Sequence, residues 1–216
     1  MERSGRWGSA GGLPVEDRPQ AAPLDGRPTA GGAGNHRSLV QIHDHLRGEL
    51  TQIRQAAVEV GAGVLSPGQA RDLINHMTMR QNRWTLGSFC AAYCRVVTIH
   101  HTIEDTSMFP ALAAVAPELD PVLDRLSAEH EIIADVLDRF DRALVLLVVE
   151  GSPSDTAGQG TAVGGTADGA TADGPAVDGP AEIARLAAEL SDLLLSHLAY
   201  EEDQLEQGLG LLTGLI

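Results

Sequence analysis

Apolar residues recur every three or four positions in four long segments of the chain, which is the spacing of one face of an α-helix. We therefore predict helices over residues 36–60, 66–109, 120–150 and 180–208. Asn35 is a candidate N-cap and Gly61 a stop for the first helix. Ser66 and Gln69 form a capping box for the second, which is expected to end at Pro110 after a break near Asn82. With no alternating strand pattern, the fold class is all-α: an antiparallel four-helix bundle.

Three segments lack this helical period. Residues 1–35 are rich in Gly, Pro, Arg and Asp and are expected to form a disordered N-terminal tail. Residues 151–179 contain repeats of the type Thr-Ala-Asp-Gly and are interpreted as a low-complexity linker between the third and fourth helices. An apolar tail, 209–216, ends the chain. The bundle itself is therefore assigned to residues 36–208.

Each apolar stripe is interrupted by histidine or glutamate. The stripes are Leu39, Ile42, Leu46, Leu50 and Ile53; Leu86, Phe89, Tyr93, Val96, Val97 and Ile103; Leu123, Leu126, Ile133, Leu137 and Phe140; and Ile183, Leu186, Leu190, Leu194 and Leu205. The interrupting residues are His43, His100, Glu104, His130, His197 and Glu201. A carboxylate in a bundle core costs several kcal/mol unless a positive charge meets it. Because none of the stripes contains Lys or Arg, a bound metal is the expected partner.

The order of these six residues repeats along the chain. His43 is followed by His100 and Glu104, and His130 is followed by His197 and Glu201, with a spacing of four residues within each His/Glu pair. That spacing places imidazole and carboxylate one helical turn apart. Two histidines and one glutamate from each helical hairpin are what a two-metal centre bridged by two carboxylates needs. Ligands of this kind, without thiolate, suit iron or manganese and can suit zinc.

The composition narrows the range of partners and compartments. The chain has 216 residues and a formal net charge of -15, which disfavours nucleic acid and anionic membrane surfaces as partners. Its N-terminus lacks the apolar core of a secretory signal, and its longest apolar run is too short to span a bilayer. Cys90 and Cys94 are interpreted as buried thiols of a reducing compartment. We therefore expect a cytoplasmic protein.

Four short segments resemble one known family. These are Ile42-His43-Asp44-His45-Leu46-Arg47, His100-His101-Thr102-Ile103-Glu104-Asp105 with Met108-Phe109-Pro110, Glu129-His130, and His197-Leu198-Ala199-Tyr200-Glu201-Glu202. The chain resembles the hemerythrin-like proteins, the His-His-Glu cation-binding domains, over residues 36–208. The resemblance implies a four-helix bundle with a non-haem di-iron site. It implies that the six residues above are the ligands of two irons bridged by an oxo or hydroxo group.

The chain departs from the oxygen-carrying members in two places. They use His-x-x-x-His on the third helix, where this chain has Ala134 four residues after His130, and they end with a His and an Asp five apart. Four histidines and two glutamates would leave about two of six positions open on each iron. We therefore expect a catalase-like redox reaction with hydrogen peroxide or dioxygen. The alternatives are binding or sensing of oxygen, nitric oxide or iron, and iron storage; the oligomeric state stays open.

Other polar residues near these stripes receive lesser roles. His45 lies about 200° from His43 by helical geometry and is expected to be exposed. His101 is a candidate for a supporting position next to the ligands or for a seventh ligand. Tyr93 is a candidate for a supporting position, although it also fits as a core residue. His36 and His76 are interpreted as surface residues.

Overall fold

The protein is described by a computed structural model that covers residues 15–66, 68–69, 72, 92–150 and 179–213. The predicted first half of the second helix, the repeats within 151–178, and His76, Leu86, Phe89 and Cys90 lie outside these residues. Within them, every regular element is helical.

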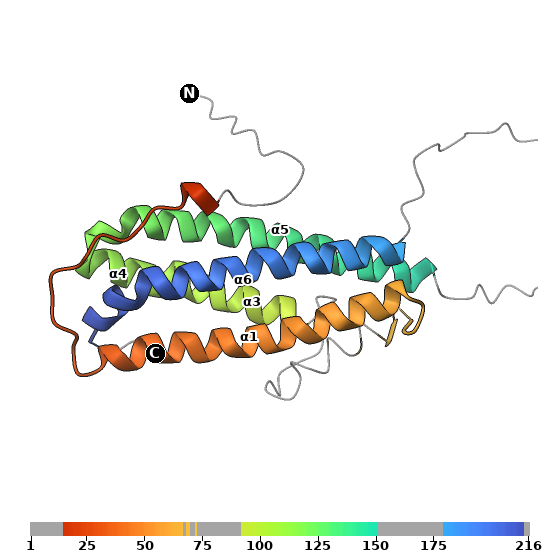
Figure 1. Ribbon diagram of the computed structural model, residues 1–216, viewed down its shortest axis with the longest axis horizontal. Coiled ribbons are helices and arrows are strands. Elements are labelled where there is room, and N and C mark those ends of the chain that lie inside the picture. Colours follow the sequence, from red (N-terminus) through yellow and green to blue (C-terminus); the bar gives the residue numbers. More distant parts are fainter. Residues whose placement is uncertain (1–14, 67, 70–71, 73–91, 151–178, 214–216) are drawn as a thin grey trace, which may run out of the picture.

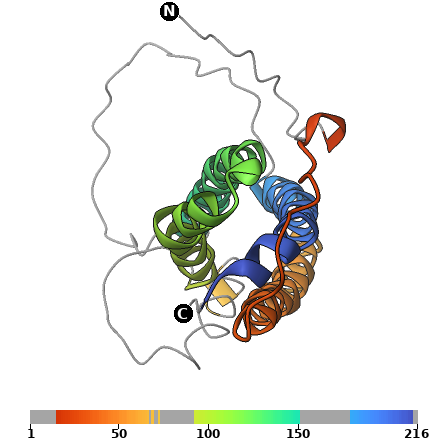
Figure 2. The same ribbon diagram turned by 90° about the vertical axis from the view of Figure 1, so that its left-hand side faces the viewer.

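Four helical arms run alternately up and down around a common axis (Figures 1 and 2). The first arm is α1 (Gly32–Gly61), and the second consists of α3 (Ala92–Ile103), the π-helical turn η2 (Glu104–Met108) and α4 (Phe109–Val115). The short 3-10 turn η3 (Pro117–Leu119) leads into α5 (Asp120–Glu150), and α6 (Gly179–Leu211) completes the bundle. Helix α6 packs against both α1 and α5, and α5 also contacts α3. The predicted antiparallel four-helix bundle is confirmed. No helix among the described residues has the length and apolarity needed to cross a membrane.

The ends of α1 differ partly from the prediction. The helix begins at Gly32 instead of after Asn35, whose side-chain amide donates to the carbonyl of Leu209 at 3.2 Å. Asn35 was therefore wrongly predicted as an N-cap, because it links α1 to the end of α6. The capping box after α1 is confirmed: the Gln69 amide donates to Ser66 Oγ at 3.2 Å, and the Ser66 amide donates to Gln69 Oε1 at 2.9 Å.

Pro110 does not end the second arm, contrary to the prediction. The π-helical turn η2 precedes it, and the Phe109 amide donates five residues back to the carbonyl of Glu104. A wider turn relieves the clash that a proline ring makes with the carbonyl four residues before it. Pro110 then lies in the first turn of α4, where a missing N–H costs little, and the helix continues to Val115.

The core has two apolar halves. One half is formed by residues such as Leu50, Val97, Phe140 and Leu190, and the other by residues such as Leu112, Leu126 and Leu205. The predicted stripes of α5 and α6 are buried throughout, with Leu123, Leu126, Ile133, Leu137, Phe140, Ile183, Leu186, Leu190, Leu194 and Leu205 all in these clusters. The stripe assignments of Ile42 and Ile103 are wrong, since both side chains are exposed. Cys94 is buried, as expected.

The predicted disordered tail differs from the structure over residues 15–35. After η1 (Val15–Asp17), the chain runs alongside the C-terminal half of α6 and in the same direction (Figure 1). Three backbone amides of this N-terminal strap, residues 15–31, donate to α6: Ala21 to Gln204 Oε1 at 2.6 Å, Leu24 to Gln207 Oε1 at 3.0 Å, and Thr29 to the Gly210 carbonyl at 2.8 Å. Hydrogen bonds to α6 thus hold this segment in place, and such bonds leave no apolar period in the sequence from which the segment could be predicted.

The expected tail 209–216 also begins as structure. Helix α6 continues past Gly208 to Leu211, and Leu209 and Leu212 are buried in the core half that contains Leu112. Gly208 does not end the helix. It marks a close approach instead, since a Cβ there would lie 2.6 Å from Leu119 Cδ1.

Gly32 tests the close contact between the start of α1 and the end of α6. A Cβ at this position would collide with the backbone carbonyl of Gly210, which cannot move aside as a side chain could. Gly32→Ala should therefore lower the free energy of unfolding by about 1–3 kcal/mol. The matched control is Gly48→Ala, which has open space around it and should raise that free energy by about 0.5–1 kcal/mol. Denaturant unfolding of both variants provides the comparison, and equal stability of the two would contradict the packing.

Candidate metal centre

Two groups of metal-ligating side chains lie between the two apolar halves of the core. One group consists of His43, His100, Glu104 and Glu201, and the other of His101, His130 and His197. Within each group the ligand atoms lie within 4.8 Å of one another, and all seven side chains are buried. All four helical arms contribute. The structure thus brings the six ligands expected from the sequence together, with His101 as a seventh.

The two carboxylates connect the groups. Glu104 Oε1 lies 3.0 Å from His100 Nε2, and its Oε2 lies 3.6 Å from His130 Nε2. Glu201 Oε2 lies 3.5 Å from His43 Nε2 and 3.6 Å from His197 Nε2. Each glutamate therefore faces one imidazole of each group, as a carboxylate that bridges two metal ions must.

The atoms that face one another here have no hydrogen-bond partner within the described part of the protein. They are the Nε2 atoms of His101, His130 and His197 and both carboxylate oxygens of Glu104 and Glu201. Burial of such polar atoms without partners is rare and costly. Seven of them at the meeting point of two histidine groups fit a pair of metal ions, because imidazole Nε2 and carboxylate oxygen are the donors that such ions take.

A carboxylate orients the imidazole of His197 from behind. His197 Nδ1 lies 3.1 Å from Glu129 Oε2, which fixes the ring with Nε2 toward the centre. Glu129 in turn accepts hydrogen bonds from Arg18 and Arg125. Burial alone would raise the pKa of Glu129, but the hydrogen bonds from His197, Arg18 and Arg125 outweigh it and lower the pKa to about 2. Glu129 is thus ionised at neutral pH.

Two further histidines have the same kind of support. His130 Nδ1 lies 3.0 Å from Asp105 Oδ1, which also accepts a hydrogen bond from the Ser127 hydroxyl at 2.7 Å. His43 Nδ1 lies 2.8 Å from Glu202 Oε1. The Arg47 guanidinium donates to the same oxygen at 2.8 Å. Carboxylates behind metal-ligating histidines hold the ring tautomer and increase the basicity of the coordinating nitrogen.

Burial shifts the pKa of each of these side chains in the direction that favours its neutral form. It lowers the pKa of His43 and of His100 to about 3 and that of His130 to about 4, and it also lowers those of His101 and His197. Burial raises the pKa of Glu201 to about 8 and, together with the nearby Glu201 carboxylate, raises that of Glu104 well above its usual range. Without metal, the histidines at neutral pH are therefore ready to coordinate, whereas the glutamates hold protons.

The sequence profile of the hemerythrin HHE cation binding domain matches residues 35–157, more than half of the chain. This chain belongs to the hemerythrin HHE cation-binding family. No curated protein and no solved structure matches it. The match includes α1, α3, α4 and α5, and α6 lies beyond it. The structure shows that α6 nevertheless supplies His197 and Glu201 to the same centre.

The structure places His101 beside the ligands expected from the sequence. This hemerythrin-family chain has five inward-facing histidines, not four, because the His101 ring stacks on His130 at a centroid distance of 4.0 Å within the three-histidine group. Ala134, where the oxygen carriers have histidine, is exposed. The second arm thus places an imidazole in this group, whereas the third arm has no second histidine there. The burial of His101 among other histidine rings could not be predicted from helical phase, since His100 beside it also points inward.

The other histidines agree with the sequence analysis where they can be compared. His45 is exposed and lies 3.4 Å from Glu49, away from the ligands. His36 is half-buried at the periphery, with Nε2 3.1 Å from the carbonyl of Glu202. Tyr93 is a core residue whose hydroxyl donates to the Leu46 carbonyl at 3.3 Å. Its role next to the ligands is therefore not supported by a contact with any of them.

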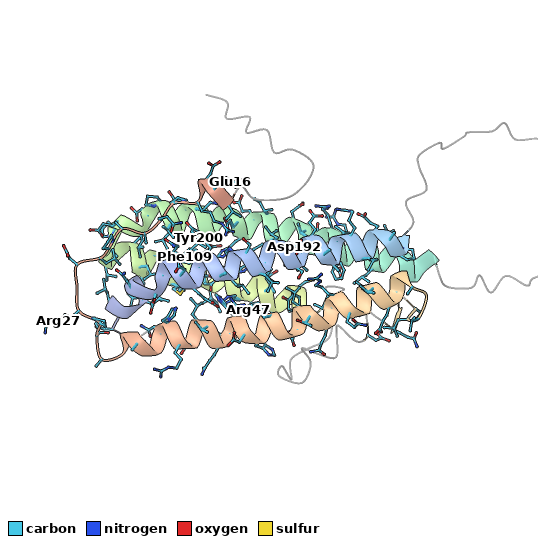
Figure 3. The ribbon with its side chains drawn as sticks, viewed as in Figure 1. Glu16, Arg27, Arg47, Phe109, Asp192 and Tyr200 are labelled. Atoms are coloured by element: carbon cyan, nitrogen blue, oxygen red, sulfur yellow. The ribbon has the colours of Figure 1, made fainter. Side chains whose placement is uncertain are left out.

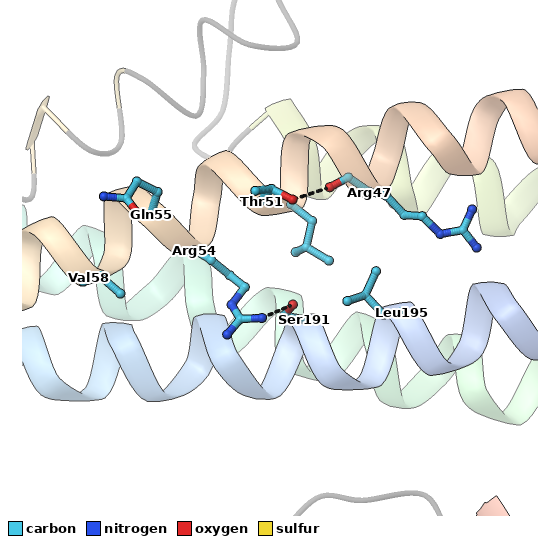
Figure 4. A pocket seen from close by; sticks show the side chains of 8 residues that line it. Arg47, Thr51, Arg54, Gln55, Val58, Ser191 and Leu195 are labelled. Atoms are coloured by element: carbon cyan, nitrogen blue, oxygen red, sulfur yellow. Dashed lines mark hydrogen bonds between the residues drawn. The ribbon is translucent and has the colours of Figure 1, made fainter.

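A groove with a cavity volume of about 300 Å³ lies between α1 and α6. Arg54 donates to Ser191 Oγ across it at 3.3 Å, and Leu195 lies next to Ser191 on the same helix (Figure 4). Arg47 lines the same groove and also binds Glu202, the partner of His43. Figure 3 shows Arg47 at the side of α1 that faces α6. Arg47 and Glu202 thus connect the groove to the metal centre.

Replacement of His101 tests whether this residue binds a metal ion or only lies beside the ligands. His101→Ala removes an imidazole from the three-histidine group only, so iron content should fall from about two to about one per chain. His45→Ala, on an exposed face of α1, should leave it unchanged. Metal analysis of both purified variants makes the comparison. Full iron content in His101→Ala would mean that four histidines suffice.

Metal binding should release protons at neutral pH. The raised pKa values of Glu104 and Glu201 mean that metal must displace their protons, whereas the histidines are already neutral. Apparent affinity for iron(II) should therefore rise with pH from pH 6 to about 8, the pKa of Glu201. Calorimetric titrations in two buffers of different ionisation enthalpy measure the released protons, roughly one to two per chain. An affinity that does not change between pH 6 and pH 8 would be the contrary result.

Proposed function

We propose that the protein holds two irons between these groups and binds a small ligand of the size of dioxygen or nitric oxide there. The observation that carries the proposal is the placement of Glu104 and Glu201, each between one histidine of either group. A centre for one metal would not need both carboxylates in that position. Membership of a cation-binding family supports metal as the occupant.

Iron is favoured by the kind of ligands present. Five imidazoles and two carboxylates offer nitrogen and oxygen donors, and Cys94 belongs to the apolar core half away from them. A donor set without thiolate and with several imidazoles suits iron, and iron supplies redox chemistry toward dioxygen and peroxide. The chain itself contributes a dry site, because His43, His197 and Glu201 are fully buried.

The two positions differ in the number of histidines. Three imidazoles, His101, His130 and His197, surround one, whereas His43 and His100 serve the other. The position with fewer protein donors is the one where an external ligand has room to bind.

The presence of five histidines near the centre, instead of four, favours a different activity from the one expected from the sequence. Peroxide turnover was expected because the chain lacked a fifth histidine, and His101 provides one. Ala134→His, on an exposed position, would add no ligand. Binding of a small molecule, whether for transport or for sensing, is therefore the better supported function. Iron storage receives no support, since the described residues form one such centre.

Iron-loaded protein tests the proposal directly. Anaerobic reconstitution followed by metal analysis should give about two irons per chain, and a stoichiometry fixed near one would contradict the proposal. Mixing with dioxygen should produce an optical change that is reversed by removing the gas. Mixing with hydrogen peroxide should produce little more oxygen than free iron does. Rapid peroxide consumption without a reversible dioxygen adduct would instead establish the catalase-like reaction.

A further inference from the structure

Arg18 is the one described side chain of the N-terminal strap that forms an ion pair in the core. It is 8 % exposed, although it precedes α1 and belongs to a segment without apolar period. Its Nε donates to Glu129 Oε1 and its Nη2 to Glu129 Oε2, both at 2.9 Å. This two-pronged arrangement is the most directional contact that a guanidinium makes with a carboxylate.

The same guanidinium is held from α6. Arg18 Nη1 donates to the Ser196 carbonyl at 3.1 Å and to the Ser196 hydroxyl at 2.9 Å. Its central carbon lies 4.7 Å from the centre of the Tyr200 ring, close enough for a cation–π contact. The strap therefore presents Arg18 in one fixed orientation, between α5 and α6, next to the residue before His197.

Glu129 carries this contact to the metal centre. Its Oε2 accepts from Arg18 and lies 3.1 Å from His197 Nδ1, so a single oxygen joins the strap to a ligand of the three-histidine group. Arg125 Nε also donates to Glu129, at Oε1. Arg18 holds both oxygens, and it thereby sets the direction in which Glu129 meets the imidazole.

We propose that Arg18 is a positioning residue of the metal centre, which orients His197 through Glu129 and makes the N-terminal strap part of the metal-binding unit. The inference rests on the proposed metal centre and adds a segment outside the matched family region. The strap does not need Arg18 to stay in place. The Tyr200 hydroxyl donates to the Pro19 carbonyl at 2.6 Å, and the backbone amides of Ala21, Leu24 and Thr29 bind α6 independently.

Arg18→Ala and Arg27→Ala form a matched pair for the first test. Both remove an arginine from the strap, but Arg27 is exposed at its outer turn (Figure 3). Iron(II) is titrated anaerobically into the metal-free full-length chain. Arg18→Ala should weaken binding at one of the two positions by about 10–100-fold, the usual effect of losing a residue that supports a ligand, and leave the other unchanged. Arg27→Ala should bind as the wild type does.

Arg47→Ala provides the complementary case. Arg47 supports Glu202, and Glu202 supports His43, in the other group of ligands. Cobalt(II), whose absorption spectrum reports its coordination, distinguishes the two positions. Arg18→Ala and Arg47→Ala should therefore weaken different ones. An equal loss at both positions in Arg18→Ala would show that the strap only stabilises the fold, and would overturn the proposal.

A double-mutant cycle separates positioning from general stability. If Arg18 acts through Glu129, then Arg18→Ala should have little further effect on iron affinity in a Glu129→Gln background. Fully additive effects would refute the pathway. If Arg18→Ala fails to fold, the cycle is run with Arg18→Lys, which keeps the charge but cannot hold both oxygens and should give an intermediate affinity. Failure of the wild type to bind two irons would refute the proposed function instead, so the two results remain distinct.

Discussion

A layer of unpaired ligand atoms through the middle of the bundle is the constraint on which the rest of the structure depends. Apolar clusters lie on either side of it, and each helical arm passes from one cluster to the other through at least one histidine of the layer. The buried carboxylate oxygens of Glu104 and Glu201 have no hydrogen-bond partner in the described protein, and a bound cation would remove the cost of burying them as carboxylates. Metal binding is for this reason also a contribution to the stability of the bundle, since a site that forms only in the folded chain links the two free energies.

Outside this layer, charge is arranged in shells. The imidazoles face the centre through Nε2, carboxylates contact Nδ1 from behind on three of them, and arginines bind two of those carboxylates. In a chain of net charge -15, arginines bound to Glu129 and Glu202 fix the direction of these supporting carboxylates, and at Glu129 they also lower the pKa. From the inside outward the order is therefore imidazole, carboxylate and guanidinium.

Much of this arrangement could be predicted from sequence, because helical period fixes which residues share a face. His43, His130, His197 and Glu201 fall on strict apolar stripes, and the structure buries all of them. Glu129 was missed, although its position three residues after Leu126 and four before Ile133 places it on the same stripe. His101 could not be separated from His100 by phase alone, because two adjacent residues can both face a wide polar layer. Arg18 escaped notice for a different reason: its segment is positioned by hydrogen bonds to α6 and has no apolar pattern to detect. The π-helical turn that carries the chain past Pro110 likewise depends on tertiary packing and leaves no period in the sequence.

The positions of α6 and of the strap determine which shorter fragments of the chain can fold. A fragment limited to residues 35–157 would contain the whole region matched by the family profile, but only three of the four arms. It would lack His197 and Glu201, the guanidinium of Arg18 that binds both oxygens of Glu129, and the helix that packs against both α1 and α5. The remaining arms would then expose Leu46, Leu50, Ile133 and Phe140 to solvent, and the expected product is an aggregating polypeptide instead of a smaller metalloprotein. The smallest unit that can be produced intact therefore extends from the strap to the end of α6.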